Sequence, residues 1–209
     1  SYKGNTRESL RSYLQPFKTG ITDRLKDEYQ AAFDSWKGNL YYVSRQFERW
    51  LNQSLEAELK EILLKEEKSF ELLNAVNKHL SFYLKSFRER LNDNLARVLG
   101  VEMKSEQWEI TVGEYRKPSI TISRSFEFHL DMLWFLFPMF IFRGVFRHYF
   151  LKKIPLEVEK NLHRLTSLLT EQVNKRMDDL MKQSMVYINE ELNMIETLLV
   201  ETRGDSSYI

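Results

Sequence analysis

Apolar residues between positions 40 and 98 recur at every third or fourth place in the chain. This spacing puts them on one face of an α-helix, and it continues well beyond the length of an average globular helix. The rhythm breaks at "KEEKS" (65–69), where we expect the helix to bend, or to end and restart, and Gly100 is expected to stop it. The members of this first stripe are Leu40, Val43, Phe47, Leu51, Leu55, Leu59, Ile62, Phe70, Leu73, Val76, Leu80, Leu84, Phe87, Leu91, Leu95 and Val98.

A second stripe with the same spacing occupies the last third of the chain. It predicts another long amphipathic helix, of about 45 residues, with one apolar face. Its members are Val158, Leu162, Leu165, Leu169, Val173, Met177, Leu180, Met185, Ile188, Leu192, Ile195 and Leu199.

Long helices with a single apolar face must bury that face against one another. We therefore predict an all-α fold, an elongated antiparallel bundle of long helices. If the two stripes pack antiparallel, residues near Leu91 lie close to Leu165, and residues near Leu55 lie close to Leu192.

An earlier segment, at about 6–37, is also helical in character, and Pro16 and Gly20 are expected to kink or interrupt it. The whole chain is predicted to form one helical domain over 1–209. Its parts would be helical arms in 1–100, a tip segment in 101–153, a return helix in 154–202 and a tail in 203–209.

The helical rhythm is lost in "QWEITVGEYRKPSITIS" (107–123). Apolar and polar residues alternate there on both sides of a polar stretch that contains Gly113 and Pro118. This pattern is typical of two short strands joined by a turn, or of an extended excursion from the bundle.

The run "MLWFLFPMFIF" (132–142) contains eleven apolar residues in succession. It lies between Asp131 and Arg143 and holds Pro138, so it is too short to span a bilayer, which requires about 20 apolar residues. From 132 to 156 the chain has four cations and no acid. Aromatic and apolar residues beside cations are typical of a segment that inserts at the interface of an anionic membrane. The candidate membrane-contact residues are Leu133, Trp134, Phe135, Leu136, Phe137, Met139, Phe140, Ile141, Phe142, Arg143, Arg147, Lys152 and Lys153.

The same run also fits a buried core at the end of the bundle. In that interpretation Arg143 and Arg147 pair with Asp131, or with Glu157 and Glu159. The expected position of the run, at the turn between two long helices, favours the membrane interpretation, because a core is hardest to build there.

Catalytic and ligand-binding functions find little support in the sequence. The four histidines are scattered, cysteine is absent, and no glycine-rich phosphate-binding loop occurs. The net charge of +1 gives no overall attraction to nucleic acid. We therefore expect this chain to be no enzyme, to hold no cofactor or metal, and to bind no nucleic acid.

Residues 129–180 resemble the C-terminal stalk of bacterial dynamin-like GTPases. In that family an L-W-F-x-x-P-M segment precedes F-R, an Arg-His pair and a helix that begins I-P-x-E-V-E-K-N-L-x-R-L. The matching residues are Leu133, Trp134, Phe135, Pro138, Met139, Phe142, Arg143, Arg147, His148, Ile154, Pro155, Glu157, Val158, Glu159, Lys160, Asn161, Leu162, Arg164 and Leu165.

The resemblance implies a longer parent chain with a GTPase domain elsewhere, a lipid-contacting tip and self-assembly into a homo-oligomer. It implies a cytoplasmic protein that lies peripherally at the inner face of the membrane. The expected function is a stalk that transmits GTPase motion to the tip during membrane remodelling. The alternatives are a soluble helical scaffold or oligomerisation module that uses the aromatic segment as a protein-contact site, and an α-helical pore-former.

Overall fold

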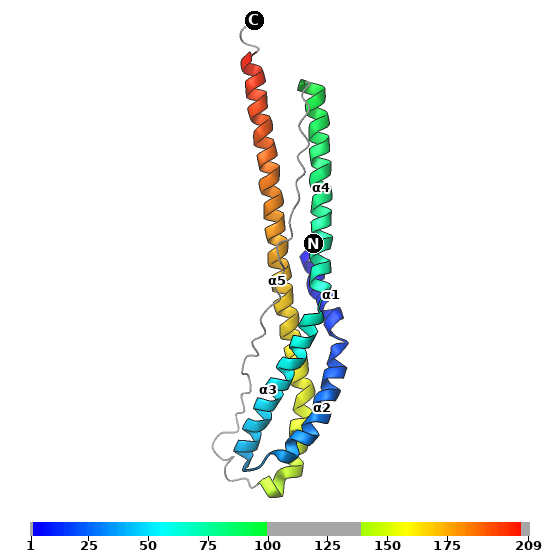
Figure 1. The fold of residues 1–209 in the computed structure, drawn as a ribbon, viewed down its shortest axis with the longest axis vertical. Helices are drawn as coiled ribbons and strands as arrows, with labels where there is room; N and C mark the ends of the chain where they lie inside the picture. Colours follow the sequence, from blue (N-terminus) through cyan, green and yellow to red (C-terminus); the bar gives the residue numbers. More distant parts are fainter. Residues whose placement is uncertain (1, 100–138, 206–209) are drawn as a thin grey trace. The chain divides into compact units, whose positions relative to one another are not determined.

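The computed structural model describes residues 2–99 and 139–205, and in these ranges the chain is helical, with no strand (Figure 1). The predicted all-α bundle is confirmed. The predicted hairpin at 107–123 lies outside the described residues. The helices are α1 (Tyr2–Leu14), α2 (Phe17–Ser35), α3 (Leu40–Lys65), α4 (Lys68–Leu99) and α5 (Met139–Asp205).

Most helix ends lie where the sequence predicts them. Pro16 separates α1 from α2, whereas Gly20 continues α2 without a break. Within "KEEKS" the helix ends and restarts, between Lys65 and Lys68. α3 begins after Asn39, whose side-chain oxygen accepts a hydrogen bond from the Tyr42 amide at 3.1 Å, a standard N-cap.

The start of α5 differs from the prediction. A return helix was expected over 154–202, because the resemblance implies a helix that begins at Ile154 and Pro155. In the structure, residues 139–153 already form about four helical turns before Pro155, which lies inside α5. The part of the predicted tip segment that follows Pro138 is therefore the first portion of a 67-residue helix.

Contacts group the chain into two compact units. Unit 1 comprises residues 1–68 and 117–170, and unit 2 comprises residues 69–116 and 171–209. Among the described residues, unit 1 holds α1, α2, α3 and the first part of α5, and unit 2 holds nearly all of α4 and the rest of α5. The single domain over 1–209 stays a prediction.

In unit 1, α2 runs antiparallel to both α3 and α5. Contacts of α2 with α3 join Arg24 to Glu58 and Tyr29 to Phe47, and contacts of α2 with α5 join Lys18 to Glu159 and Tyr29 to Arg147. Hence α3 and α5 run parallel to each other. The core of unit 1 is formed by buried side chains of all four helices, among them Leu10, Leu14, Ile21, Leu25, Phe33, Val43, Leu51, Leu55, Ile154, Val158, Leu165 and Leu169.

In unit 2, α4 and α5 also run in the same direction (Figure 1). Arg88 Nε lies 3.7 Å from Glu191 Oε1. The predicted antiparallel direction of the two stripes, with Leu91 near Leu165, is therefore wrong. The 39 residues between α4 and α5 can span up to about 130 Å, so this connection does not force the second helix to reverse.

The second stripe is buried along only part of its length. Up to Leu180 its members face the core, but beyond that point the buried side chains of α5 are Ser184, Tyr187 and Glu191. The predicted core residues Met185 and Leu192 are exposed instead. Since both lines of residues have helical spacing, periodicity alone did not decide which one faces α4.

Two glycines should respond oppositely to alanine substitution. Gly38, between α2 and α3, has φ +115°, and a Cβ there would lie 3.3 Å from Tyr42 Cβ. Gly144 lies within α5, where a Cβ would meet open space. We expect Gly38→Ala to lower the free energy of unfolding by about 1–3 kcal/mol, and Gly144→Ala to raise it by about 0.5–1 kcal/mol. Denaturant titration measures both changes, and a stabilising Gly38→Ala would contradict the described backbone.

Candidate functional site

Aromatic side chains from three helices pack together where α2 ends and α3 and α5 begin. Phe47 of α3 stacks on Phe150 of α5, with ring centroids 4.5 Å apart and planes inclined by 23°. Phe33 of α2 meets Phe150 edge to face at 6.5 Å. This arrangement fixes the first turns of α5 beside the end of α2. The cluster consists of Tyr29, Phe33, Trp36, Phe47, Trp50 and Phe150.

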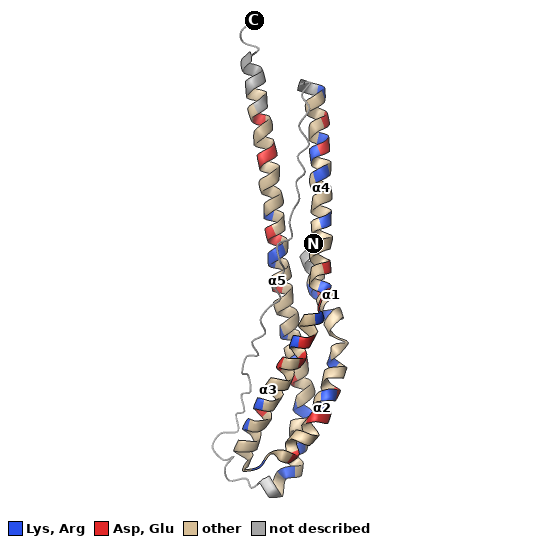
Figure 2. Cartoon of the chain, in the orientation of Figure 1, with Lys and Arg blue, Asp and Glu red and all other residues tan. Residues whose placement is uncertain are grey.

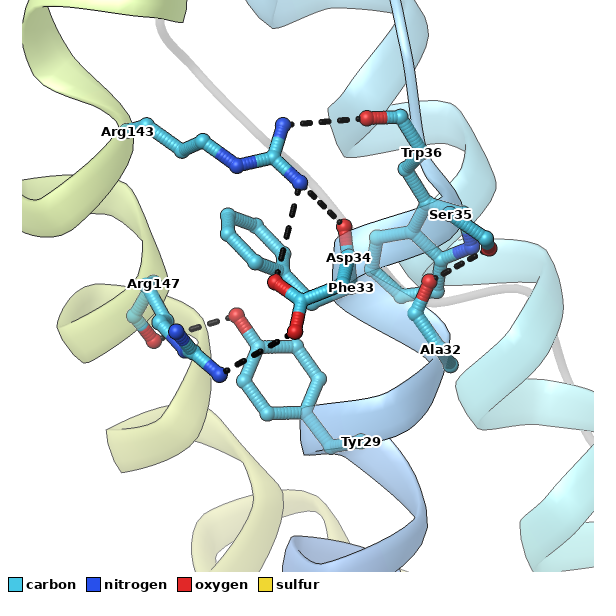
Figure 3. A network of polar contacts seen from close by, with 8 residues as sticks. All are labelled: Tyr29, Ala32, Phe33, Asp34, Ser35, Trp36, Arg143 and Arg147. Atoms are coloured by element: carbon cyan, nitrogen blue, oxygen red, sulfur yellow. Dashed lines mark hydrogen bonds and ion pairs between the residues drawn. The ribbon is translucent and has the colours of Figure 1, made fainter.

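Arg143 closes the C-terminal end of α2 from the neighbouring helix. Its Nη2 donates a hydrogen bond to the Phe33 carbonyl at 2.8 Å, and its Nη1 donates one to the Trp36 carbonyl at 3.1 Å (Figure 3). The guanidinium also lies over the Phe33 ring, 4.8 Å from the centroid. The last carbonyls of a helix lack partners within the helix and carry partial negative charge, so a cation satisfies them well.

Arg147, one turn further along α5, extends this network. Its Nη2 lies 3.7 Å from Asp34 Oδ2, while Arg143 Nη2 lies 3.9 Å from Asp34 Oδ1 (Figure 3). The Tyr29 hydroxyl donates a hydrogen bond to the Arg147 carbonyl at 3.1 Å. Burial raises the pKa of Tyr29 well above its usual range, although the two nearby arginines oppose the shift.

Two of the predicted lipid-facing cations therefore contact α2. The core interpretation expected Arg143 and Arg147 to pair with acids, and among the described residues that acid is Asp34. Glu157 pairs with Lys160 and Glu159 with Lys18 instead, and Asp131 lies outside the described residues. Asp34 follows Phe33 near the end of a helix more than a hundred residues earlier, so no local spacing in the sequence linked it to α5.

The opposite side of the first turns of α5 faces solvent. Ile141 and Val145 are 61% and 66% exposed, and His148 and Lys152 are exposed on the same side. Lys153 lies over the Tyr149 ring at 5.1 Å. From Ile141 to Lys153 the helix carries four cations and no acid (Figure 2).

The start of α3 adds exposed tyrosines at the same end of unit 1. Tyr41 and Tyr42 are both exposed, with their rings 5.7 Å apart. Arg45 lies over the Tyr41 ring at 5.6 Å and pairs with Glu48 at 3.1 Å. We call seven of the exposed side chains at this end the end surface; they are Lys37, Tyr41, Tyr42, Ile141, Val145, His148 and Lys152. Asp34, Arg45, Arg147 and Tyr149 are exposed at the same end.

The predicted site residues thus fall into five groups. Phe142 and Lys153 are half-buried, Ile141 and Lys152 are exposed, and Arg143 and Arg147 contact α2. Met139 and Phe140 form the first residues of α5. The rest lie outside the described residues, namely Leu133, Trp134, Phe135, Leu136 and Phe137.

The sequence analysis did not predict that Asp34, Tyr41, Tyr42 and the aromatic cluster belong to this end of unit 1. The spacing of Tyr29, Phe33 and Trp36 on one helical face was a usable signal for the cluster. In the part of the chain that the structure describes, no helix is long and apolar enough to cross a membrane. No group of three or more potential metal ligands gathers among the same residues.

No family model, curated protein or solved structure matches the chain.

The contribution of Arg143 can be measured directly. Arg143→Ala removes two charge-assisted hydrogen bonds to helix-end carbonyls, and we expect it to lower the free energy of unfolding by about 2 kcal/mol. The partly exposed pair with Asp34 adds little to this value. Lys152→Ala, on the solvent side of the same helix, should change stability by less than about 0.5 kcal/mol. Equal effects of the two substitutions in denaturant titrations would contradict the capping role.

The raised pKa of Tyr29 predicts a loss of stability at alkaline pH. The unfolded chain releases the Tyr29 proton near pH 10, whereas the folded chain retains it. The free energy of unfolding therefore falls as the pH rises above about 10. Tyr29→Phe cannot release this proton, so its stability should fall less steeply above that pH. Melting temperatures across the alkaline range test this expectation, and identical slopes for the two proteins would refute it.

Proposed function

We propose that this chain is a helical module that contacts an anionic membrane surface through the end surface of unit 1. The observation that supports it most is the concentration of exposed aliphatic and tyrosine side chains at the end where α5 begins. Tyrosines favour the boundary between lipid and water, because each has an apolar ring and a polar hydroxyl.

The charges at this end favour the same partner. Residues 34–48 and 139–153 together hold six cations and two acids, a net charge of +4 in a chain whose total is +1. Arg143 and Arg147 contact α2 and Arg45 pairs with Glu48, so Lys37 and Lys152 are the cations best placed to meet lipid headgroups. Each cation near an anionic surface contributes about 1 kcal/mol, and salt weakens this contribution.

The apolar part of the contact contributes a free energy of similar size. Ile141 and Val145 lie one turn apart on the exposed side of α5, at the end of the eleven-residue apolar run. Moving each side chain from water into the headgroup boundary would contribute about 1 kcal/mol. The described residues alone thus supply a modest affinity, to which Trp134 and its neighbours in the run would add.

A role for the contact follows from the sequence resemblance. As the stalk of a dynamin-like parent protein, the bundle would connect a GTPase domain to the membrane and transmit its motion during remodelling. The support for this role is the similarity of residues 129–180 to such stalks. The membrane contact itself rests on the exposed residues and their charge, and it can be tested without the parent chain.

Co-sedimentation with lipid vesicles tests the proposal. The wild-type chain should bind vesicles that contain anionic lipid, bind neutral vesicles more weakly, and lose most of the difference at high salt. Ile141→Asp with Val145→Asp should lower the partition coefficient about tenfold or more, because both carboxylates would enter the boundary.

The matched control is Leu168→Asp, which alters an exposed apolar residue of α5 far from the end surface. It should leave binding unchanged. All variants should keep the helicity and melting temperature of the wild type, because the altered side chains are exposed. A wild-type chain that ignores anionic vesicles at low salt, or a double variant that binds as well as wild type, would refute the membrane contact.

A further inference from the structure

The C-terminal part of α5 carries a stripe of apolar side chains that α4 leaves exposed, apart from Ile188 and Ile195, which are half-buried. Met181, Met185 and Leu192 are 54%, 57% and 46% exposed. They are spaced by four and then seven residues, so they share one face of the helix. We call this face the outer stripe; it consists of Met181, Met185, Ile188, Leu192, Ile195 and Leu199.

The outer stripe has the spacing of a coiled-coil seam. Its members follow one another at steps of four, three, four, three and four residues. The side of α5 that faces α4 is more polar over the same length, since it buries Ser184, Tyr187 and Glu191. The most regular apolar seam of α5 therefore lies to one side of the line of residues that faces α4. A contiguous apolar face of this kind marks an interaction site.

We infer that the outer stripe binds the outer stripe of a second copy of this chain, with the two α5 helices antiparallel. The stripe is complementary to itself in this direction, because a two-fold axis level with residue 190 brings every member opposite another member. The contact layers would join Met181 to Leu199, Met185 to Ile195, and Ile188 to Leu192 of the second copy.

The charges that flank the stripe select the antiparallel direction. In this pairing Lys182 lies opposite Glu196 of the second copy, and this attraction occurs twice by symmetry. A parallel pairing in register would separate Lys182 from Glu196 of the second copy and lose this attraction. Asn189 lies opposite Asn189 of the second copy in the antiparallel pairing.

The length of the stripe sets the expected strength. Its 19 residues extend over about 28 Å, fewer than three heptads, and short coiled coils are weak. Reversible association in the micromolar range is expected for such a contact. The interface lies wholly within unit 2, so it does not depend on the proposed membrane contact.

Sedimentation equilibrium of the 209-residue chain, without lipid, tests the dimer. The wild-type chain should change from monomer to dimer as its concentration rises. Met185→Glu with Leu192→Glu should raise the dissociation constant about a hundredfold or more, because four carboxylates would enter the seam. The control is Val186→Glu with Val200→Glu, which alters two exposed valines beside the stripe. The control should change the constant less than threefold, and each double variant should keep wild-type helicity.

Charge exchange and cross-linking test the direction. Lys182→Glu alone should weaken the dimer, and adding Glu196→Lys should restore it.

The natural chain has no cysteine, so Asn189→Cys supplies a single thiol that should form a disulfide between two copies only if the helices are antiparallel. Glu196→Lys alone should also weaken an antiparallel dimer, because Lys182 would then face a lysine of the second copy. A chain that is monomeric at every concentration, or a dimer unaffected by Met185→Glu with Leu192→Glu, would overturn the inference.

Discussion

The contact between Arg143 and the end of α2 organises unit 1. Its guanidinium satisfies the Phe33 and Trp36 carbonyls, lies over the Phe33 ring and approaches Asp34. Since helix-end carbonyls are costly to leave without partners near a packed cluster, this contact fixes both the rotation and the position of the first turns of α5. The stacking of Phe47 on Phe150 completes the attachment from α3.

That rotation determines which residues meet solvent. Because Arg143, Arg147 and Phe150 point toward α2 and α3, Ile141, Val145 and Lys152 must lie on the outer side of α5. The basic residues of this segment therefore divide into Arg143 and Arg147, which contact α2, Lys153, which lies over the Tyr149 ring, and Lys152, which is exposed to a partner. The same principle operates in unit 2, where the burial of Tyr187 and Glu191 toward α4 turns Met185 and Leu192 outward.

The helices could be predicted from the sequence, but the direction in which they pack against one another could not. Spacings of three and four residues located α3, α4 and most of α5, and Pro16 located the break between α1 and α2, because these signals are local. The parallel direction of α3 and α5 depends on contacts such as Phe47 with Phe150, between residues far apart in the chain. For the same reason the core interpretation expected an acid beside Arg143, but Asp34 could not be recognised before the fold brought α2 and α5 together.

The central claim is that, among the described residues of unit 1, the end surface is the part that meets a membrane. A cysteine-free chain allows a single environment-sensitive fluorophore to be placed at Val145→Cys, and the same label at Leu168→Cys reports on the side of α5 far from that end. On addition of anionic vesicles, the emission of the label at residue 145 should shift to the blue while that of the label at residue 168 stays constant. A shift at residue 168 alone, equal shifts at both positions, or no shift at residue 145 would contradict the account.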